Sequence, residues 1–264
     1  MTTAPRKMSM GLVTRGGVQL PPRTMIYGVD GIGKSTFGAQ APAPIFIPTE
    51  DGASRIDVPQ FPLCETWGDV MGALRSLCQE PHDYKTLVLD SADWAQALAH
   101  AHVVKQYFGG DQQAFDDYGK GYKVLMQEWL KLLGALDYTR RHTGMEVILI
   151  AHAVIKTFHS PTGDDYDHYQ SNLGDSQSCS VWAKTKEWCD IVLFATYAVT
   201  VRKADKKDTK GKAVQVKGEG ERVCHAAPAA SWTAKVRAGW MLPDKFPLCQ
   251  ADFRKHLNQT EKGS

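Results

Sequence analysis

Residues 28–35 read Gly28-Val29-Asp30-Gly31-Ile32-Gly33-Lys34-Ser35 and match the phosphate-binding pattern G-x-x-x-x-G-K-[ST] at every position. An apolar run precedes them at 23–27, and a short helical pattern follows from Thr36 until Pro42 stops it. Glycines allow a tight turn that points successive backbone N–H groups at a phosphate, and the helix N-terminus adds positive potential. We therefore expect residues 28–36 to bind a nucleotide, with Lys34 at the β- and γ-phosphates and the Ser35 hydroxyl on Mg²⁺. The alternative is a glycine-rich turn with an incidental lysine, which the flanking strand and helix disfavour.

The composition is that of a folded globular protein, with 264 residues, 43% of them hydrophobic and 23% charged. The 31 basic and 29 acidic residues nearly cancel, so any nucleic-acid site must be a local patch. Six cysteines without a C-x-x-C pair indicate a reduced, cytoplasmic protein. The longest nearly apolar run, 191–201, is far shorter than the roughly 20 residues that cross a bilayer, so we expect no membrane partner.

Continuous apolar runs alternate with helical patterns along the chain. The runs lie at 23–27, 44–48, 86–89, 147–151 and 188–201, the last as one strand or two, and the helical patterns at 67–80, 93–107 and 121–142. This alternation predicts an α/β fold with a mostly parallel central sheet flanked by helices. Residues 221–225 and 233–237 are candidates for added antiparallel edge strands. We expect an N-terminal arm (1–22), one core (23–248) and a C-terminal helix and tail (249–264).

Asp90 ends the apolar run TLVL and is the candidate metal acid. A nucleotide-bound Mg²⁺ needs such a carboxylate at the end of a neighbouring strand, and we expect Asp90 to hold it together with Ser35. The alternative is a helix cap, a role that Ser91 and Asp93 could share.

Hydrolysis also needs a group that activates water, and Ser91 occupies the place directly after the metal acid. Glu50 ends the run PIFIPTE and would lie at the same carboxyl edge of the sheet, with Asp51 as its local rival. His152 ends the run VILIAH, where it could bond the γ-phosphate and report it to the next segment. A solvated loop acid and an ordinary strand-end histidine are the alternatives for these two residues.

These runs resemble the strands of RecA-type ATPases. The stretch 88–98 (VLDSADWAQAL) resembles their metal-binding strand, 46–50 (FIPTE) the strand that ends in the catalytic glutamate, and 147–156 (VILIAHAVIK) the strand that ends in a γ-phosphate sensor. The whole layout, from about Arg23 to Leu248, is similar to phage-encoded, core-only RecA-like proteins, the single-strand annealing ATPases of the Sak-four type. The stretches that carry this resemblance lie at 118–122, 166–173, 187–197 and 234–248.

The resemblance implies ATP and Mg²⁺ as ligands and a homo-oligomer, filament or ring, with ATP between subunits. It also implies that Lys235 and Arg237 reach the nucleotide of a neighbouring subunit. Residues two apart on a strand point the same way, so both cations could address one phosphate cluster. Two exposed charges on an edge strand are the alternative.

In RecA-type proteins the segment after the sensing strand binds single-stranded DNA, which implies that role for residues 153–185. Aromatic and basic side chains suit sequence-tolerant binding of a single strand, and the candidates are Lys156, Phe158, Tyr166, Tyr169 and Lys184, with Trp182 as a further stacking platform. Four aspartates in the segment weaken its charge, and a nucleotide-gated lid or subunit contact is the alternative. The basic stretch within 202–220 is a second candidate, although such runs are more often solvated hairpin tips.

The sequence therefore predicts an ATP-dependent recombination protein that binds single-stranded DNA and anneals or pairs strands. ATP hydrolysis to ADP and phosphate would be stimulated by DNA, in the cytoplasm of a bacterial host, with a single-strand-binding protein as a further partner. A RecA-fold ring helicase or translocase is one alternative, although no accessory domain that could load a ring is visible. A scaffold protein that anneals strands and uses ATP only as a structural switch is the other.

Overall fold

The computed structural model describes residues 8–13, 20–52, 55–160, 163–176, 179–201 and 216–261. Its helices are the short η1 (Met10–Leu12) and η2 (Asp117–Gly119), and α1 (Lys34–Ala39), α2 (Trp67–Gln79), α3 (Ala92–Tyr107), α4 (Gln112–Asp116), α5 (Lys120–Thr143), α6 (Val181–Trp188) and α7 (Gln250–Glu261). Its strands are β1 (Arg23–Gly28), β2 (Pro44–Pro48), β3 (Thr86–Asp90), β4 (Glu146–Phe158), β5 (Tyr166–Ser171), β6 (Asp175–Ser176), β7 (Cys179–Ser180), β8 (Ile191–Val201), β9 (Val216–His225), β10 (Lys235–Val236) and β11 (Lys245–Pro247).

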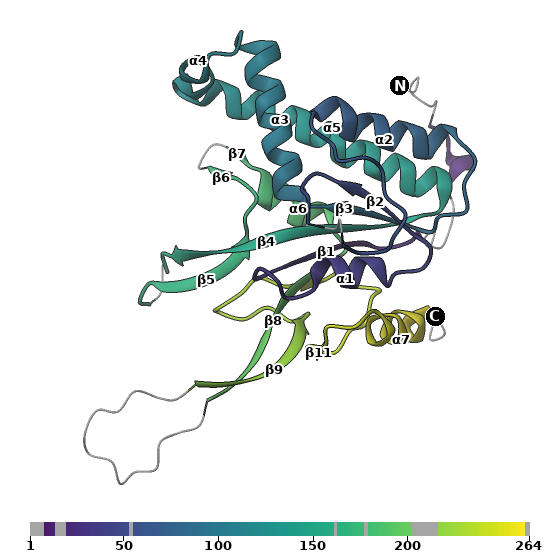
Figure 1. Cartoon of the computed structure of the whole chain (residues 1–264), viewed down its shortest axis with the longest axis vertical. Helices are drawn as coiled ribbons and strands as arrows, with labels where there is room; N and C mark the ends of the chain where they lie inside the picture. Colours follow the sequence, from purple (N-terminus) through teal and green to yellow (C-terminus); the bar gives the residue numbers. More distant parts are fainter. Residues whose placement is uncertain are drawn as a thin grey trace.

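The central sheet has the strand order β11-β9-β8-β1-β4-β3-β2 (Figure 1). The five strands from β8 to β2 are parallel to their neighbours, and β9, β10 and β11 add antiparallel pairings near the C-terminus. The predicted α/β fold with a mostly parallel sheet is confirmed. Gly28 pairs with His152 and Pro48 with Asp90, so the carboxyl ends of these strands meet at one edge.

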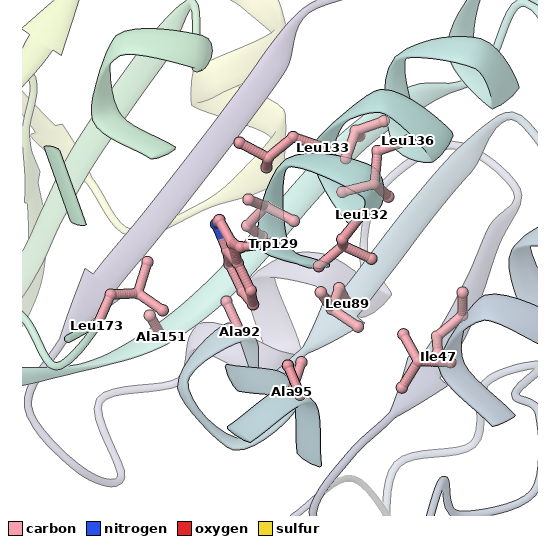
Figure 2. Packing of buried hydrophobic residues seen from close by; sticks show 14 of the residues in the cluster. Ile47, Leu89, Ala92, Ala95, Trp129, Leu132, Leu133, Leu136, Ala151 and Leu173 are labelled. Atoms are coloured by element: carbon pink, nitrogen blue, oxygen red, sulfur yellow. The ribbon is translucent and has the colours of Figure 1, made fainter. Parts of the chain in front are cut away.

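Helices cover both faces of the sheet, which explains why its central strands are apolar throughout. Helices α1 and α7 lie on one face, where Phe37 and Phe253 pack with Ile26 and Ile150. Helices α2, α3 and α5 cover the other face, and Figure 2 shows leucines of α5 gathered with Trp129 above Ala92 and Ala95 of α3. The indole of Trp129 is fully buried and donates to the Thr185 hydroxyl at 2.8 Å, which joins α5 to α6.

The segment after the fourth parallel strand differs from the expectation of a loop. β4 runs on past His152 to Phe158 and returns as β5, and this hairpin projects beyond the sheet (Figure 1). The second half of β4 leaves the covered core and becomes progressively exposed, and the polar residues His152, Lys156 and Thr157 interrupt the apolar run that marks the first half. Residues 181–188 form α6, so the apolar run expected at 188–201 is a single strand that begins only at Ile191.

Other expectations meet the structure in part. The edge strand expected at 233–237 is reduced to Lys235–Val236, and the one expected at 221–225 begins at Val216. The basic residues 202–215, and residues 1–7 and 14–19 of the expected arm, lie outside the described residues. Within the described part of the chain, no helix is both long and apolar enough to cross a membrane.

Candidate nucleotide-binding site

The loop after β1 has the backbone shape that phosphate binding requires. Gly31 and Gly33 have φ angles of 69° and 104°, in the left-handed region that glycine adopts without strain. Helix α1 begins at Lys34, whose ammonium donates to the carbonyl oxygens of Gly28 and Val29, each at 3.0 Å. Burial lowers the pKa of Lys34, and nearby carboxylates oppose this shift. Lys34 therefore folds back onto the loop that a phosphate would contact.

Two close approaches explain glycines of this loop. A Cβ on Gly28 would lie 2.2 Å from the carbonyl oxygen of Ala195 on β8, which no side chain can occupy. At Gly33 it would lie 3.0 Å from Nη1 of Arg222 on β9. The sequence did not identify Arg222. Alternate residues of a strand share a face, and Arg222 lies two residues before Cys224, which packs on the α1 face.

Asp90 ends β3 beside this loop, and its carboxylate is 2% exposed. The Ser35 hydroxyl is close enough to favour the ionised carboxylate, while Oδ2 has no hydrogen-bond partner among the described residues. Burial raises the pKa of Asp90, against the opposing effects of Ser35, Lys34 and His152. Asp90 does not cap α3, because Ser91 holds the N-cap position. A buried carboxylate with a free oxygen beside a serine hydroxyl fits Mg²⁺, which takes one or two protein ligands and completes its shell with phosphate and water.

Glu50 and His152 meet at the same edge of the sheet. Nε2 of His152 lies 3.7 Å from Oε1 of Glu50 and 3.9 Å from Oδ1 of Asp30 in the phosphate-binding loop. On its other side the ring bonds Asp93 of α3, Nδ1 to Oδ2 at 2.8 Å. The side chain of Glu50 is 21% exposed and turned into the site, whereas its rival Asp51 is exposed.

Thr49 holds the end of β2 against the end of β3. Its hydroxyl donates to the carbonyl of Ser91 at 2.7 Å and accepts from the Ser91 N–H at 2.9 Å, and its own N–H donates to the carbonyl of Asp90. These bonds fix the two strand ends, and with them the backbone positions of Glu50 and Asp90. The sequence analysis did not identify Thr49, because these contacts join residues about forty positions apart.

The charges of the site are unbalanced. Four carboxylates surround it, against the ammonium of Lys34, the guanidinium of Arg222 beside Gly33, and the imidazole of His152, whose pKa Asp93 and Glu50 raise; the carboxylates are those of Asp30, Glu50, Asp90 and Asp93. A cavity of about 830 Å³ opens beside them, between α3 and the root of the β4–β5 hairpin. A triphosphate that entered here would add negative charge, and it would bind only with added cations, such as Mg²⁺, that offset this charge.

Lys235 and Arg237 lie at the other end of the sheet, at the amino ends of β1 and β8. Lys235 donates to the carbonyls of three residues at the end of α6, among them Cys189, while Arg237 bonds the Glu187 carbonyl and pairs with Asp190 at 3.0 Å. Burial and the charge of Arg237 lower the pKa of Lys235. The two side chains therefore both contact the turn between α6 and β8. This turn is about 16 Å from their own glycine loop, counted along the length of β1 at about 3.3 Å per residue.

The structure brings together three of the five residues expected to bind DNA. Lys156, Phe158 and Tyr166 share one face of the hairpin, and the two rings lie 5.2 Å apart. Tyr169 instead stacks on Phe194 at the sheet.

The remaining residues of this group lie elsewhere. Lys184 is on α6, where it pairs with Glu187 at 2.9 Å. Trp182 is 4% exposed in the core, and the expectation that it is a stacking platform is wrong.

The glycine loop, the buried carboxylate of Asp90 and the parallel sheet define the class of P-loop nucleoside triphosphatases. The profile of the AAA domain family matches residues 20–238, most of the chain, and the protein belongs to this family. No curated protein matches it. Among solved structures it is similar to the crystal structure of the RadB recombinase, at 15% identity over 78% of this chain and 81% of that one, with a TM-score of 0.40.

Proposed function

We propose that this protein is a RecA-like ATPase that binds single-stranded DNA and pairs or anneals strands in recombination, with ATP bound between copies of the chain. The observation that carries the proposal is the continuity of β4. His152 lies beside Glu50 and Asp30 at the edge of the sheet, and the same strand continues into the exposed hairpin that carries Lys156 and Phe158. Movement of His152 on ATP binding or hydrolysis would therefore be passed along β4 to the segment proposed to bind DNA.

Each residue of the site has a task in hydrolysis. Lys34 and the loop N–H groups would bind the β- and γ-phosphates. Ser35 and Asp90 would hold Mg²⁺, which would offset negative charge on the phosphates. Glu50 would orient water and accept its proton, and His152 would donate a hydrogen bond to the γ-phosphate.

The hairpin supports the DNA-binding part of the proposal. Phe158 is 47% exposed, and the pair that it forms with Tyr166 offers a surface on which bases can stack. Lys156 lies on the same face, where it could bond a phosphate. Asp167 is on the opposite face, bound to the Thr157 hydroxyl, so its charge is directed away from this surface.

The positions of Lys235 and Arg237 support a shared site. They lie at the sheet end opposite their own loop, and the site has an excess of carboxylates over cations. A neighbouring copy that presented Lys235 and Arg237 to this site would offset the charge that develops during phosphoryl transfer.

The test is ATP turnover by the full chain, with and without single-stranded DNA, for wild type, Lys34→Ala and Arg237→Ala. We expect DNA to stimulate the wild type, each variant to lose turnover, and a mixture of the two to regain part of it. Regained activity requires an intact loop on one copy and an intact arginine on the next. Turnover that ignores DNA, or a silent Arg237→Ala, would contradict the proposal.

Glu50→Gln separates an ATPase cycle from a scaffold that uses ATP only as a switch. We expect this variant to bind ATP and DNA but to lose strand pairing over repeated cycles, measured with two labelled complementary strands. Pairing at the wild-type rate without turnover would favour the scaffold.

A further inference from the structure

Asp93 is a buried carboxylate to which neither the glycine loop nor the proposed Mg²⁺ site assigns a role. It lies in the first turn of α3, and its side chain is 8% exposed. Both oxygens are directed at His152: Oδ2 bonds Nδ1 at 2.8 Å, and Oδ1 accepts from the backbone N–H of the same residue at 3.2 Å. Burial raises the pKa of Asp93, but these hydrogen bonds and the charge of His152 outweigh burial and hold the pKa below its usual value.

This contact decides how the imidazole of His152 is used. A carboxylate accepts only, so Nδ1 must carry a proton, and the ring cannot rotate without losing the 2.8 Å bond. Nε2 is then turned toward the site, 3.7 Å from Glu50 and 3.9 Å from Asp30. With carboxylates on both sides, the ring is favoured as an imidazolium that donates from both nitrogens.

The charged groups around the ring come from every element packed on it. Asp93 is on α3, Glu50 follows β2, Asp30 is in the glycine loop, and Lys34 on α1 is the one opposing cation that faces it among the described residues. The hairpin contributes an uncharged contact, the N–H of Asn172, which donates to the His152 carbonyl at 2.9 Å.

We propose that Asp93 is a positioning residue for His152: it holds the ring in one orientation, with Nε2–H directed at the place where the γ-phosphate meets Glu50. In the free protein that N–H faces Glu50; with ATP bound it donates to a γ-phosphate oxygen and releases the glutamate to act on water. The proposal rests on the ATPase function proposed above and assigns Asp93 a part in it.

A double-mutant cycle on the full chain tests this coupling. Glutamine at position 152 can donate to a phosphate but needs no carboxylate behind it, so Asp93 should matter only when His152 is present. We expect Asp93→Asn to lower kcat about tenfold with KM within about twofold, within the range of coupling between contacting residues. In the His152→Gln background the same substitution should change kcat less than about twofold.

Asp69→Asn is the matched control, because Asp69 completes the capping box at the start of α2 and makes no contact with His152, Glu50 or Asp30. It should lower thermal stability and leave kcat unchanged. If Asp93 serves only to begin α3, Asp93→Asn will behave in the same way, or will lower kcat equally in both backgrounds, and either result overturns the proposal. A wild type without ATP turnover would instead refute the proposed function, and the next measurement still judges Asp93.

The ring itself can be observed by NMR of the histidine-labelled, nucleotide-free protein, with His152→Gln to assign the signals. We expect both ring nitrogens of His152 to be protonated at pH 7 in the wild type and the Nδ1 signal to change in Asp93→Asn. An unprotonated Nδ1 in the wild type, or an unchanged spectrum in the variant, overturns the proposal without reference to activity.

Discussion

The guanidinium of Arg222 lies beside the turn of the glycine loop, on the side where β9 passes the end of the sheet. Among the described residues it pairs with no carboxylate, and its Nη1 would lie 3.0 Å from a Cβ at position 33. We expect Arg222→Ala to weaken binding of ATP and ADP about tenfold, the equivalent of one hydrogen bond to a charged phosphate. Titration with a fluorescent nucleotide measures this, with Glu221→Ala on the opposite face as control. Unchanged affinity would exclude Arg222 from the nucleotide site.

Thr49 makes a second prediction at the residue scale. Thr49→Val keeps the shape of the side chain but leaves the buried N–H of Ser91 without its acceptor, which costs about 1–3 kcal/mol of unfolding free energy. Because Glu50 follows directly, we also expect slower ATP turnover. Urea unfolding and a turnover assay measure the two effects.

Thr139→Val is its control, since that buried hydroxyl bonds Ala135 within α5, away from the site. It should lower stability alone. If both variants lose stability but neither loses turnover, Thr49 does not position Glu50.

The site residues that the sequence predicts are polar residues at the ends of apolar runs. Asp90, Glu50 and His152 each follow such a run, and parallel strands bring their ends to one edge. Thr49, Asp93 and Arg222 could not be found in this way, because their importance lies in contacts with residues distant in sequence. Asp93 was visible only as a candidate helix cap, since a carboxylate near a helix start is common for that reason alone.

At the scale of the element, the two faces of the β4–β5 hairpin carry different residues, with Phe158 and Tyr166 on one face and Ile155 on the other. We expect Phe158→Ala combined with Tyr166→Ala to weaken binding of a single-stranded oligonucleotide by about 1–3 kcal/mol per stacked base, with DNA-free ATP turnover unchanged. Fluorescence anisotropy measures the affinity. Ile155→Ala is the matched control, because Ile155 is 54% exposed on the other face. Equal affinities for all three proteins would place the DNA site elsewhere.

The central strands were predictable as elements, whereas the hairpin and α6 were not. A strand covered on both faces is apolar at every position, and the first half of β4 has that signature. Its second half is interrupted by His152, Lys156 and Thr157 and is followed by a polar stretch, so the sequence predicted a loop there. Trp188 was assigned to the next strand because it is apolar, but it ends α6 instead.

At the scale of the whole molecule, one buried ion network joins the amino ends of β1 and β8 to α5. Asp190 accepts from Arg23 at 2.8, 3.0 and 3.1 Å, and Asp137 bridges Arg23 and Arg140. Burial raises the pKa of Asp190, but the bonds and charge of Arg23 outweigh it and hold that pKa below 3.8. Its stabilising effect is therefore complete above about pH 4 and is lost as pH falls through the lower, folded-state pKa.

We expect Asp190→Asn to lower the unfolding free energy at pH 7 by about 1.5–3 kcal/mol, because the largely buried Arg23 loses its charged hydrogen bonds to Asp190 and keeps only its ion pair with Asp137. The difference from wild type should shrink below pH 4, where the wild-type carboxylate also becomes neutral. Urea unfolding at several pH values measures this, and Asp83→Asn, at an exposed position, should have no such effect. A difference independent of pH would mean that the charge of Asp190 is not what stabilises the fold.

The contact between Gly28 and the Ala195 carbonyl bears on how genetic data from this loop should be interpreted. A methyl group at position 28 would collide with the backbone of β8 before any nucleotide arrived, so an inactive Gly28→Ala protein would report a damaged sheet. Gly31 has open space around it, and only its left-handed backbone resists substitution. Loss of function at position 28 is thus no evidence that ATP is required. Lys34→Ala removes the lysine proposed to bind the phosphates and places no atom against β8, so its phenotype is the one that can be attributed to the nucleotide.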